Sequence, residues 1–125
     1  IFMKNQKITL PKFLTNRYNL WKSTSYFQNE KNIKKLAKLG QKPQAMIISC
    51  CDSRVNVASI FGAKEGDFFI YRNIANIIPP YKSTKTDHST FAAIEYAVKE
   101  LKVPNFIVLG HTNCGGIKAG HLQHS

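Results

Sequence analysis

The sequence predicts an α/β fold, in which a mainly parallel β-sheet is flanked by helices and preceded by an N-terminal helical arm. Three short apolar runs, at residues 45–49, 67–71 and 105–109, have the length and composition of buried strands. Segments with helical signals lie before, between and after them. This alternation is typical of parallel sheets, in which ligands bind at the carboxyl ends of the strands.

Residues 1–40 are expected to form the helical arm. Residues 12–22 and 30–39 are predicted to be two helices, the second ended by Gly40 and by Pro43 shortly after it. The arm is therefore predicted to be a domain of its own, joined to the rest of the chain by a short polar connector.

Most of the positive charge lies in this arm. The net charge of the chain is +11, and residues 1–49 carry +9 because ten Lys and Arg residues are balanced by Glu30 alone. Residues 50–125 carry only +2. The lysines recur at helical spacing around apolar residues, which is typical of a solvated helix face. A docking surface for an acidic partner or nucleic acid is the alternative interpretation.

Residues 41–125 are expected to form the α/β core, which we expect to be incomplete at its C-terminus because no closing element follows the last helix. The predicted elements, in chain order, are a strand at 45–49, a helical turn at 57–61, a strand at 67–71, an amphipathic helix at about 88–102, a buried strand at 105–109 and a helix entered through the loop 110–116. The order places the C-terminal ends of three strands at one edge.

The composition excludes several classes of protein. With 125 residues, 43% of them apolar, the chain is long enough for a folded core without disulfides. No apolar run approaches a membrane span, and the start of the chain lacks a secretory apolar segment. Three cysteines cannot all pair. We therefore expect no membrane partner and a reducing compartment, the cytoplasm or the stroma or matrix of an organelle.

Metal-binding side chains follow two of the predicted strands. Cys50 ends the first strand, and the loop after the third strand contains His111 and Cys114, which share a face when the backbone turns. Two thiolates and an imidazole are ligands suited to zinc. Three protein ligands leave one tetrahedral position open, as in catalytic zinc sites. The sequence thus predicts a zinc site at the carboxyl edge of the sheet.

Three neighbours of Cys50 have distinct expected roles. Asp52 and Arg54 lie on the same face as Cys50 if the backbone stays extended, so Asp52 is either a fourth ligand or an ionised acceptor paired with Arg54. Cys51 points the other way and is expected to be a buried, small apolar residue. A cysteine nucleophile in Cys50 or Cys51 has no support beyond the metal motif.

Four segments together resemble the β-class carbonic anhydrases, over a region from about Gln41 to Ala119. They are C-x-D-S-R at 50–54, GDFFIYRNIAN at 66–76, AAIEYAV at 92–98 and GHTNCGGI at 110–117. The Gln-x-Pro approach and the Pro-Pro-Tyr loop resemble the plant-like branch of this class. The resemblance implies reversible hydration of CO₂ to bicarbonate and a proton, one Zn²⁺ per protomer, and a homodimer or larger homo-oligomer.

The resemblance also implies a role for each matching residue. Cys50, His111 and Cys114 are the implied zinc ligands, and Asp52 with Arg54 is the implied catalytic dyad. The implied substrate-binding residues are Gln41 as an amide donor, Phe69, Ile74 and Tyr96 as apolar walls of the CO₂ pocket, and the backbone near Gly115 as a donor to bicarbonate.

Two other functions remain as alternatives. The same fold and metal could hydrolyse an analogue of CO₂ such as carbon disulfide. A nucleic-acid-binding module with a closed, structural zinc site would use the basic arm, and it predicts steep salt dependence of binding. That module leaves Gln41, Asp52 and Arg54 without a role, so we predict no nucleic-acid partner.

Overall fold

The computed structural model describes residues 9–81 and 88–124. The chain divides into two compact units, with the boundary between Leu39 and Gly40, and each unit is described by itself. Within the described residues, no helix combines the length and the apolar character needed to cross a membrane.

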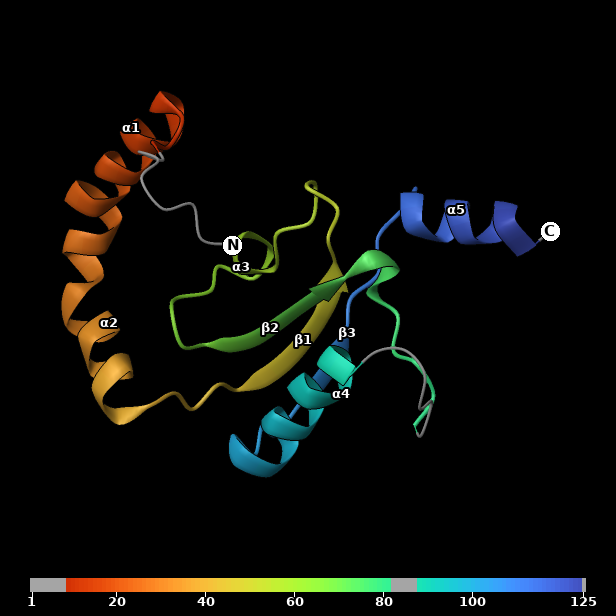
Figure 1. The fold of residues 1–125 in the computed structure, drawn as a ribbon. Helices are drawn as coiled ribbons and strands as arrows, with labels where there is room; N and C mark the ends of the chain where they lie inside the picture. Colours follow the sequence, from red (N-terminus) through yellow and green to blue (C-terminus); the bar gives the residue numbers. More distant parts are fainter. Residues whose placement is uncertain (1–8, 82–87, 125) are drawn as a thin grey trace, which may run out of the picture. The chain divides into compact units, whose positions relative to one another are not determined.

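The first unit is one long helix. It consists of α1 (Lys12–Trp21), a wide π-type turn at Lys22–Tyr26, and α2 (Phe27–Leu39), drawn in red to orange in Figure 1. Both predicted helices are present, and the residues between them, for which no helix was predicted, continue the helical path. The hydroxyls of Ser23 and Thr24 donate to the carbonyl of Leu20, at 3.1 and 2.6 Å, so polar side chains that usually favour a break instead bind the preceding turn.

The second unit is built on a parallel sheet of three strands in the order β2-β1-β3 (Figure 1). The strands are β1 (Ala45–Cys50), β2 (Phe68–Asn73) and β3 (Phe106–Val108). Every residue of β1 is buried, as expected for the central strand of a sheet covered on both faces. The prediction of an α/β fold with a mainly parallel sheet is confirmed.

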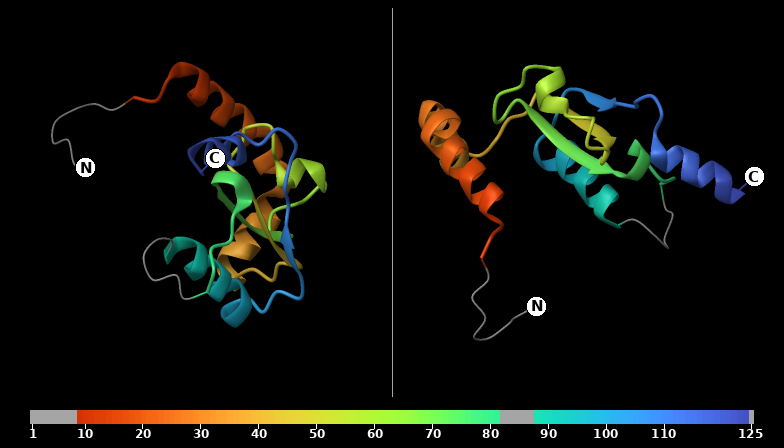
Figure 2. Two further views of the ribbon diagram at one scale, coloured as in Figure 1. Left: turned by 90° about the vertical axis from the view of Figure 1, so that its right-hand side faces the viewer. Right: turned by 90° about the horizontal axis from the view of Figure 1, so that it is seen from above.

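Helical segments cover the two faces of the sheet (Figure 2, right). On one face Ile47 packs with Val57 at the start of α3 (Val57–Ile60). On the other face Met46 and Ile48 pack with Ala97, which belongs to a π-type turn (Tyr96–Glu100) that continues α4 (His88–Glu95). Alternate residues of β1 therefore fix the sheet between two layers.

The third strand differs from its prediction. Phe106, Ile107 and Val108 are 40, 38 and 48% exposed, so the expectation of a buried strand is wrong for this chain. The reason is position, because β3 lies at the edge of the sheet and pairs with β1 only. An apolar run identifies a strand but does not say how many neighbours the strand has.

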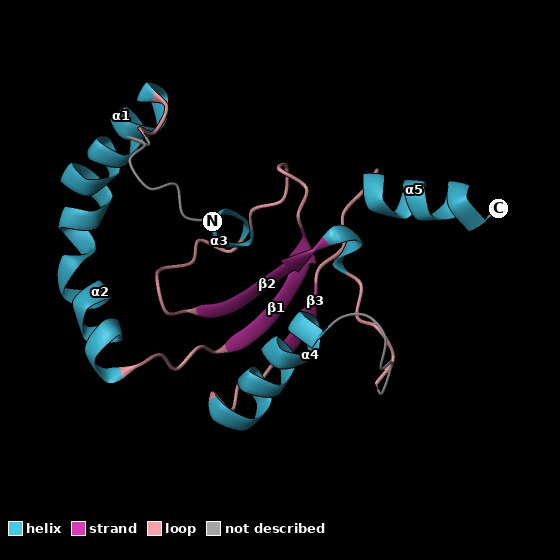
Figure 3. Ribbon diagram, in the orientation of Figure 1, coloured by secondary structure: helices cyan, strands magenta, loops and turns pink. Residues whose placement is uncertain are grey.

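The C-terminal ends of the three strands lie together (Figure 1). Loops follow β1 and β3, whereas a short 3₁₀ helix, Ile74–Asn76, follows β2 (Figure 3). The loop after β3 leads into α5 (Gly115–His124). In the order β2-β1-β3, the chain leaves β1 toward one side of the sheet and returns to its other side for β3. The crevice between β1 and β3 is therefore the topological switch point, where ligands bind in sheets of this kind.

Candidate metal centre

The switch point brings together one imidazole and two thiols. Potential ligand atoms of Cys50, His111 and Cys114 all lie within 4.8 Å of one another, and the two sulfur atoms are 3.9 Å apart. Cys50 and Cys114 are buried, and the His111 side chain is 13% exposed. Cys50 is at least 61 residues from the other two in sequence, yet the three donors are close enough to hold a single metal ion. We call these three residues the metal cluster.

The orientation of His111 fits a metal ligand. Its Nδ1 lies 2.9 Å from the carbonyl oxygen of Thr112, while its Nε2 is buried and has no hydrogen-bond partner. A histidine that donates from one ring nitrogen to a carbonyl presents a lone pair on the other, the usual arrangement of metal-bound imidazole. A buried nitrogen without a partner is costly, and a cation between the two sulfurs would satisfy it.

The electrostatics of the cluster favour a cation. The backbone N–H of Asp52, followed by the neighbouring His111, lowers the pKa of the Cys50 thiol to about 7. The Cys50 sulfur in turn raises the pKa of His111 above its ordinary value. Cys50 therefore reaches the thiolate form required of a metal ligand more readily than a free cysteine does.

Asp52 and Arg54 form a two-point ion pair beside the cluster. Arg54 Nε donates to Oδ1 of Asp52 at 3.0 Å and Nη2 donates to Oδ2 at 2.7 Å, while the backbone N–H of Arg54 donates to Oδ1 at 2.9 Å. Arg54 Nη2 also donates to the carbonyl of Asn113 at 3.1 Å. These bonds hold the pKa of Asp52 well below its usual range, so the carboxylate stays ionised 4.0 Å from Nε2 of His111.

Two contributors to this site were not predicted from the sequence. Arg72, at the end of β2, donates from Nε to the carbonyl of Cys50 and from Nη2 to that of Asp52, both at 2.8 Å. The backbone N–H of Ala75 donates to Cys50 Sγ at 3.3 Å, and Ala75 is buried against Cys50 and Cys114. The sequence did contain one signal for these contributions: the second predicted strand ends in polar residues, and that end adjoins the end of the first strand.

The loop after β2 also packs closely against the start of α5. A Cβ added to Gly116 would lie 2.6 Å from Cγ2 of Ile74, 3.1 Å from Cβ of Ala75 and 3.3 Å from the Ala75 nitrogen. The last two atoms cannot yield without moving the backbone beside Cys50. Gly116 therefore permits the close approach of the segment that carries Cys114 to the loop that contacts Cys50.

We expect Gly116→Ala to lower the free energy of unfolding by about 1–3 kcal/mol, because the added methyl overpacks this contact. Gly120→Ala in the same helix is the matched control, since a Cβ there has no neighbour within 4 Å. The control is expected to gain up to about 1 kcal/mol from helix propensity. Urea unfolding of both variants tests the pair, and equal effects of the same sign would contradict it.

The other predicted site residues separate into two groups. Ile74 and Gly115 lie at the metal cluster, next to Ala75 and Cys114 respectively, and Ile74 is 66% exposed. Cys51, expected to be buried, is instead exposed and free, because the extended backbone ends at Cys50. It is the one thiol of the three outside the cluster.

Gln41, Phe69 and Tyr96 lie toward the opposite end of the sheet. Gln41 is exposed and precedes β1, whose two ends are about 16 Å apart at about 3.3 Å per residue. Phe69 pairs with Met46 near the start of β1, and its ring lies 5.7 Å from that of Tyr96. Within one chain, these three residues are not brought to the metal cluster.

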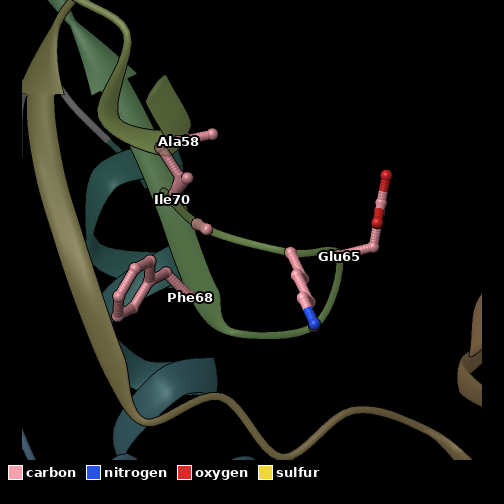
Figure 4. A pocket seen from close by; sticks show the side chains of 7 residues that line it. Ala58, Glu65, Phe68 and Ile70 are labelled. Atoms are coloured by element: carbon pink, nitrogen blue, oxygen red, sulfur yellow. The ribbon is translucent and has the colours of Figure 1, made fainter. Parts of the chain in front are cut away.

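Two hollows differ in chemistry. The one over the cluster is lined by His111, Asn113, Cys114, Ile117 and Lys118. The other lies beside α3 and β2 (Figure 4), lined by Ala58, Ala63, Lys64, Glu65, Gly66, Phe68 and Ile70. In Figure 4 the carboxylate of Glu65 extends away from Ala58 and Ile70. Only the first of these two hollows presents thiol and imidazole groups.

A parallel sheet with two thiols, an imidazole and an ionised carboxylate at its switch point defines an α/β protein with a group of side chains that could hold a metal ion. The sequence model of the family described as carbonic anhydrase matches residues 45–125. The chain belongs to this family, in its β-class.

Known members of the class are similar over most of this chain. Beta carbonic anhydrase 5, chloroplastic, of Arabidopsis thaliana is 42% identical over 106 residues, which are 85% of this chain and 34% of the relative. A carbonic anhydrase of Helicobacter pylori is 40% identical over 98 residues, 78% of this chain and 44% of the relative.

A solved structure agrees in fold. A tetrameric β-carbonic anhydrase of Sordaria macrospora superposes with a TM-score of 0.74 and 43% sequence identity, covering 88% of this chain and 52% of that one. The chain thus spans about half the length of this solved structure and less of the two curated relatives.

Proposed function

We propose that this protein is a zinc-dependent carbonic anhydrase that catalyses the reversible hydration of CO₂ to bicarbonate and a proton. The observation that carries the proposal is the cluster of Cys50, His111 and Cys114 with an ionised carboxylate, Asp52, 4.0 Å from the imidazole. Membership of the carbonic anhydrase family supports the same reaction.

Cys50, His111 and Cys114 would hold one Zn²⁺ per chain. Two soft sulfur donors and one imidazole suit zinc, and three protein donors leave one position open for a reactant. When bound, zinc supplies Lewis-acid activation of water as a nucleophile at neutral pH. The residues around it must then orient the water, admit CO₂ and receive the product.

In this proposal Asp52 orients the attacking water and Arg54 positions Asp52. A carboxylate accepts a hydrogen bond from the water and so directs a lone pair of its oxygen toward the carbon of CO₂. Arg54 donates hydrogen bonds to both oxygens of Asp52, at 3.0 and 2.7 Å. These bonds favour a role for Asp52 as a hydrogen-bond acceptor beside the metal over a role as a fourth metal ligand. The same hydrogen bonds from Arg54 keep the carboxyl group of Asp52 ionised.

The substrate is proposed to lie between Ile74 and the first turn of α5. The exposed Ile74 side chain offers an apolar wall for CO₂. The backbone N–H of Gly115, at the N-terminus of a helix of ten residues, is a suitable donor to an oxygen of bicarbonate.

We further propose that two copies of the chain complete each site. Gln41, Phe69 and Tyr96 lie toward the amino end of the sheet, far from their own chain's metal cluster. Tyr96 is 47% exposed. The three residues can serve as the amide donor and apolar wall of a CO₂ pocket if they face the cluster of a second copy, and a related structure is described as tetrameric.

Mixed oligomers test this arrangement. In a dimer of one Gln41→Ala chain and one Cys114→Ser chain, one of the two sites combines an intact metal cluster with an intact Gln41. Homodimers of either single variant, the two parents, have no such site. Co-expression at equal levels gives half mixed dimers with one of two sites intact, so we expect about a quarter of wild-type CO₂ hydration. An activity equal to the mean of the two parents would show that Gln41 acts within its own chain.

Metal content and CO₂ hydration of the full-length protein test the proposed function. We expect one zinc per chain by elemental analysis, stopped-flow hydration of CO₂, loss of activity on chelation and recovery on adding zinc. Hydrolysis of carbon disulfide without CO₂ hydration would assign the alternative substrate. A protein without zinc, or one whose zinc-loaded form binds nucleic acid and leaves CO₂ unchanged, would contradict the proposal.

A further inference from the structure

The loop that follows β2 is closed by a single side chain. The carboxamide of Asn73 binds both backbone groups of Ile77: its Nδ2 donates to the Ile77 carbonyl at 2.7 Å, and the Ile77 N–H donates to its Oδ1 at 3.0 Å. We call the segment Asn73–Ile77 the Asn73 turn. Its two bonds tie together the two ends of this segment, with residues 74–76 between them.

The backbone inside the Asn73 turn is strained. Ala75 and Asn76 have φ values of 66° and 46°, in the left-handed region that residues with a Cβ seldom occupy. Such a conformation persists only where surrounding bonds impose it, and strain of this kind gathers at functional sites. The bonds that impose it here include both bonds of the Asn73 carboxamide.

The strained residue contacts the metal cluster directly. The Ala75 N–H donates to Cys50 Sγ at 3.3 Å, and the Ala75 side chain packs with Cys50 and Cys114. Ala75 is 1% exposed, so this hydrogen bond is shielded from water. An N–H directed at a sulfur stabilises the thiolate form and limits the positions the sulfur can take.

The Asn73 turn is also fixed relative to both segments that carry the proposed ligands. Asn73 is opposite Cys50 in the pairing of β1 and β2, and its carbonyl accepts the Cys51 N–H at 2.9 Å. On the other side, Ile74 and Ala75 form the surface on which Gly116 packs, two residues after Cys114. A change in the turn is therefore transmitted to two of the three donors.

We propose that Asn73 is a positioning residue of the metal site, which acts by holding the Asn73 turn in the conformation that directs the Ala75 N–H at Cys50. This inference rests on the proposed zinc site. It assigns to Asn73 a contribution to metal affinity and ligand geometry without any contact between its side chain and the metal.

Asn73→Ala in the full-length protein tests the inference, with Asn105→Ala as a matched control. Asn105 makes the same kind of bond, from Nδ2 to the carbonyl of Gln44 at 3.0 Å, but at the other end of the sheet. Competition with a chromophoric chelator measures zinc affinity. We expect a loss of about 10- to 100-fold in Asn73→Ala, the usual effect of removing a group that supports a ligand, and a change of less than about threefold in Asn105→Ala.

The absorption spectrum of the cobalt-substituted protein reports the geometry of the ligands, which a change in overall stability alone does not alter. We expect the sulfur-to-cobalt and visible bands of Asn73→Ala to shift or broaden, while those of Asn105→Ala match the wild type. Asn73→Asp keeps the acceptor for the Ile77 N–H but sets a charged oxygen against the Ile77 carbonyl, so it should change the bands in the same direction. It also serves if Asn73→Ala does not fold.

Two outcomes would overturn the inference and leave the proposed function intact: wild-type zinc affinity and cobalt spectra in the Asn73 variants, or equal losses in Asn73→Ala and Asn105→Ala. A wild-type protein that binds no zinc would contradict the proposed function itself, and the inference with it.

Discussion

Replacing Cys114 with serine is expected to abolish zinc retention and, with it, CO₂ hydration. Zinc binds protein sites with about 10–16 kcal/mol, so loss of one of three donors costs roughly 4 kcal/mol, or about a thousandfold in affinity. The hydroxyl of serine does not supply the sulfur donor that Cys114 contributes 3.9 Å from the sulfur of Cys50. Elemental analysis after dialysis and stopped-flow hydration measure the two effects.

Cys51→Ser provides the control for this substitution. Cys51 is adjacent to Cys50 in sequence, but it is exposed and lies outside the cluster. We expect Cys51→Ser to keep its zinc. If Cys114→Ser keeps stoichiometric zinc, or if Cys51→Ser loses it, the assignment of the ligands is wrong.

Asp52→Asn is expected to separate catalysis from metal binding. The variant keeps the size of the side chain and loses its charge, so the attacking water loses its acceptor while all three metal donors remain. We expect CO₂ hydration to fall by about 100-fold or more, the loss that misplacing a reacting group can cause, with zinc content close to the wild type. Arg54→Ala should also lower turnover, because it frees Asp52 to approach the metal.

Glu95→Gln is the matched control for the loss of a paired carboxylate. Glu95 binds Lys99 at 3.1 Å on the exposed surface of the α4 segment, and exposed pairs of this kind contribute little. Its turnover is expected to equal that of the wild type. Unchanged turnover in both Asp52→Asn and Arg54→Ala would show that the ion pair beside the cluster has only a structural role.

The grouping of the three candidate metal ligands could be predicted from the sequence because it depends only on the direction of the strands. Cys50 ends one apolar run, and His111 and Cys114 follow another. In a parallel sheet such ends meet whatever the details of packing. The spacing of Asp52 and Arg54 within one short turn was equally local, and the structure pairs them.

Features that depend on neighbours could not be predicted in the same way. The contact of Ala75 with Cys50 requires both the register of β1 with β2 and a left-handed alanine, which no local pattern indicates. Exposure of β3 depends on how many strands surround it. Helical structure at Ser23 and Thr24 was not evident either, because such hydroxyls can bind the preceding turn, as both do here at the Leu20 carbonyl, or can favour a break.

The cluster is divided between the most and the least protected strands of the sheet. Cys50 belongs to β1, which is buried throughout, whereas His111 and Cys114 follow β3, whose residues are more than a third exposed. Local opening begins where few apolar contacts oppose it. We therefore expect local opening of the β3 edge to detach two of the proposed donors together and to leave Cys50 in place. A bound metal ion would then exchange through a partial opening, without global unfolding of the chain.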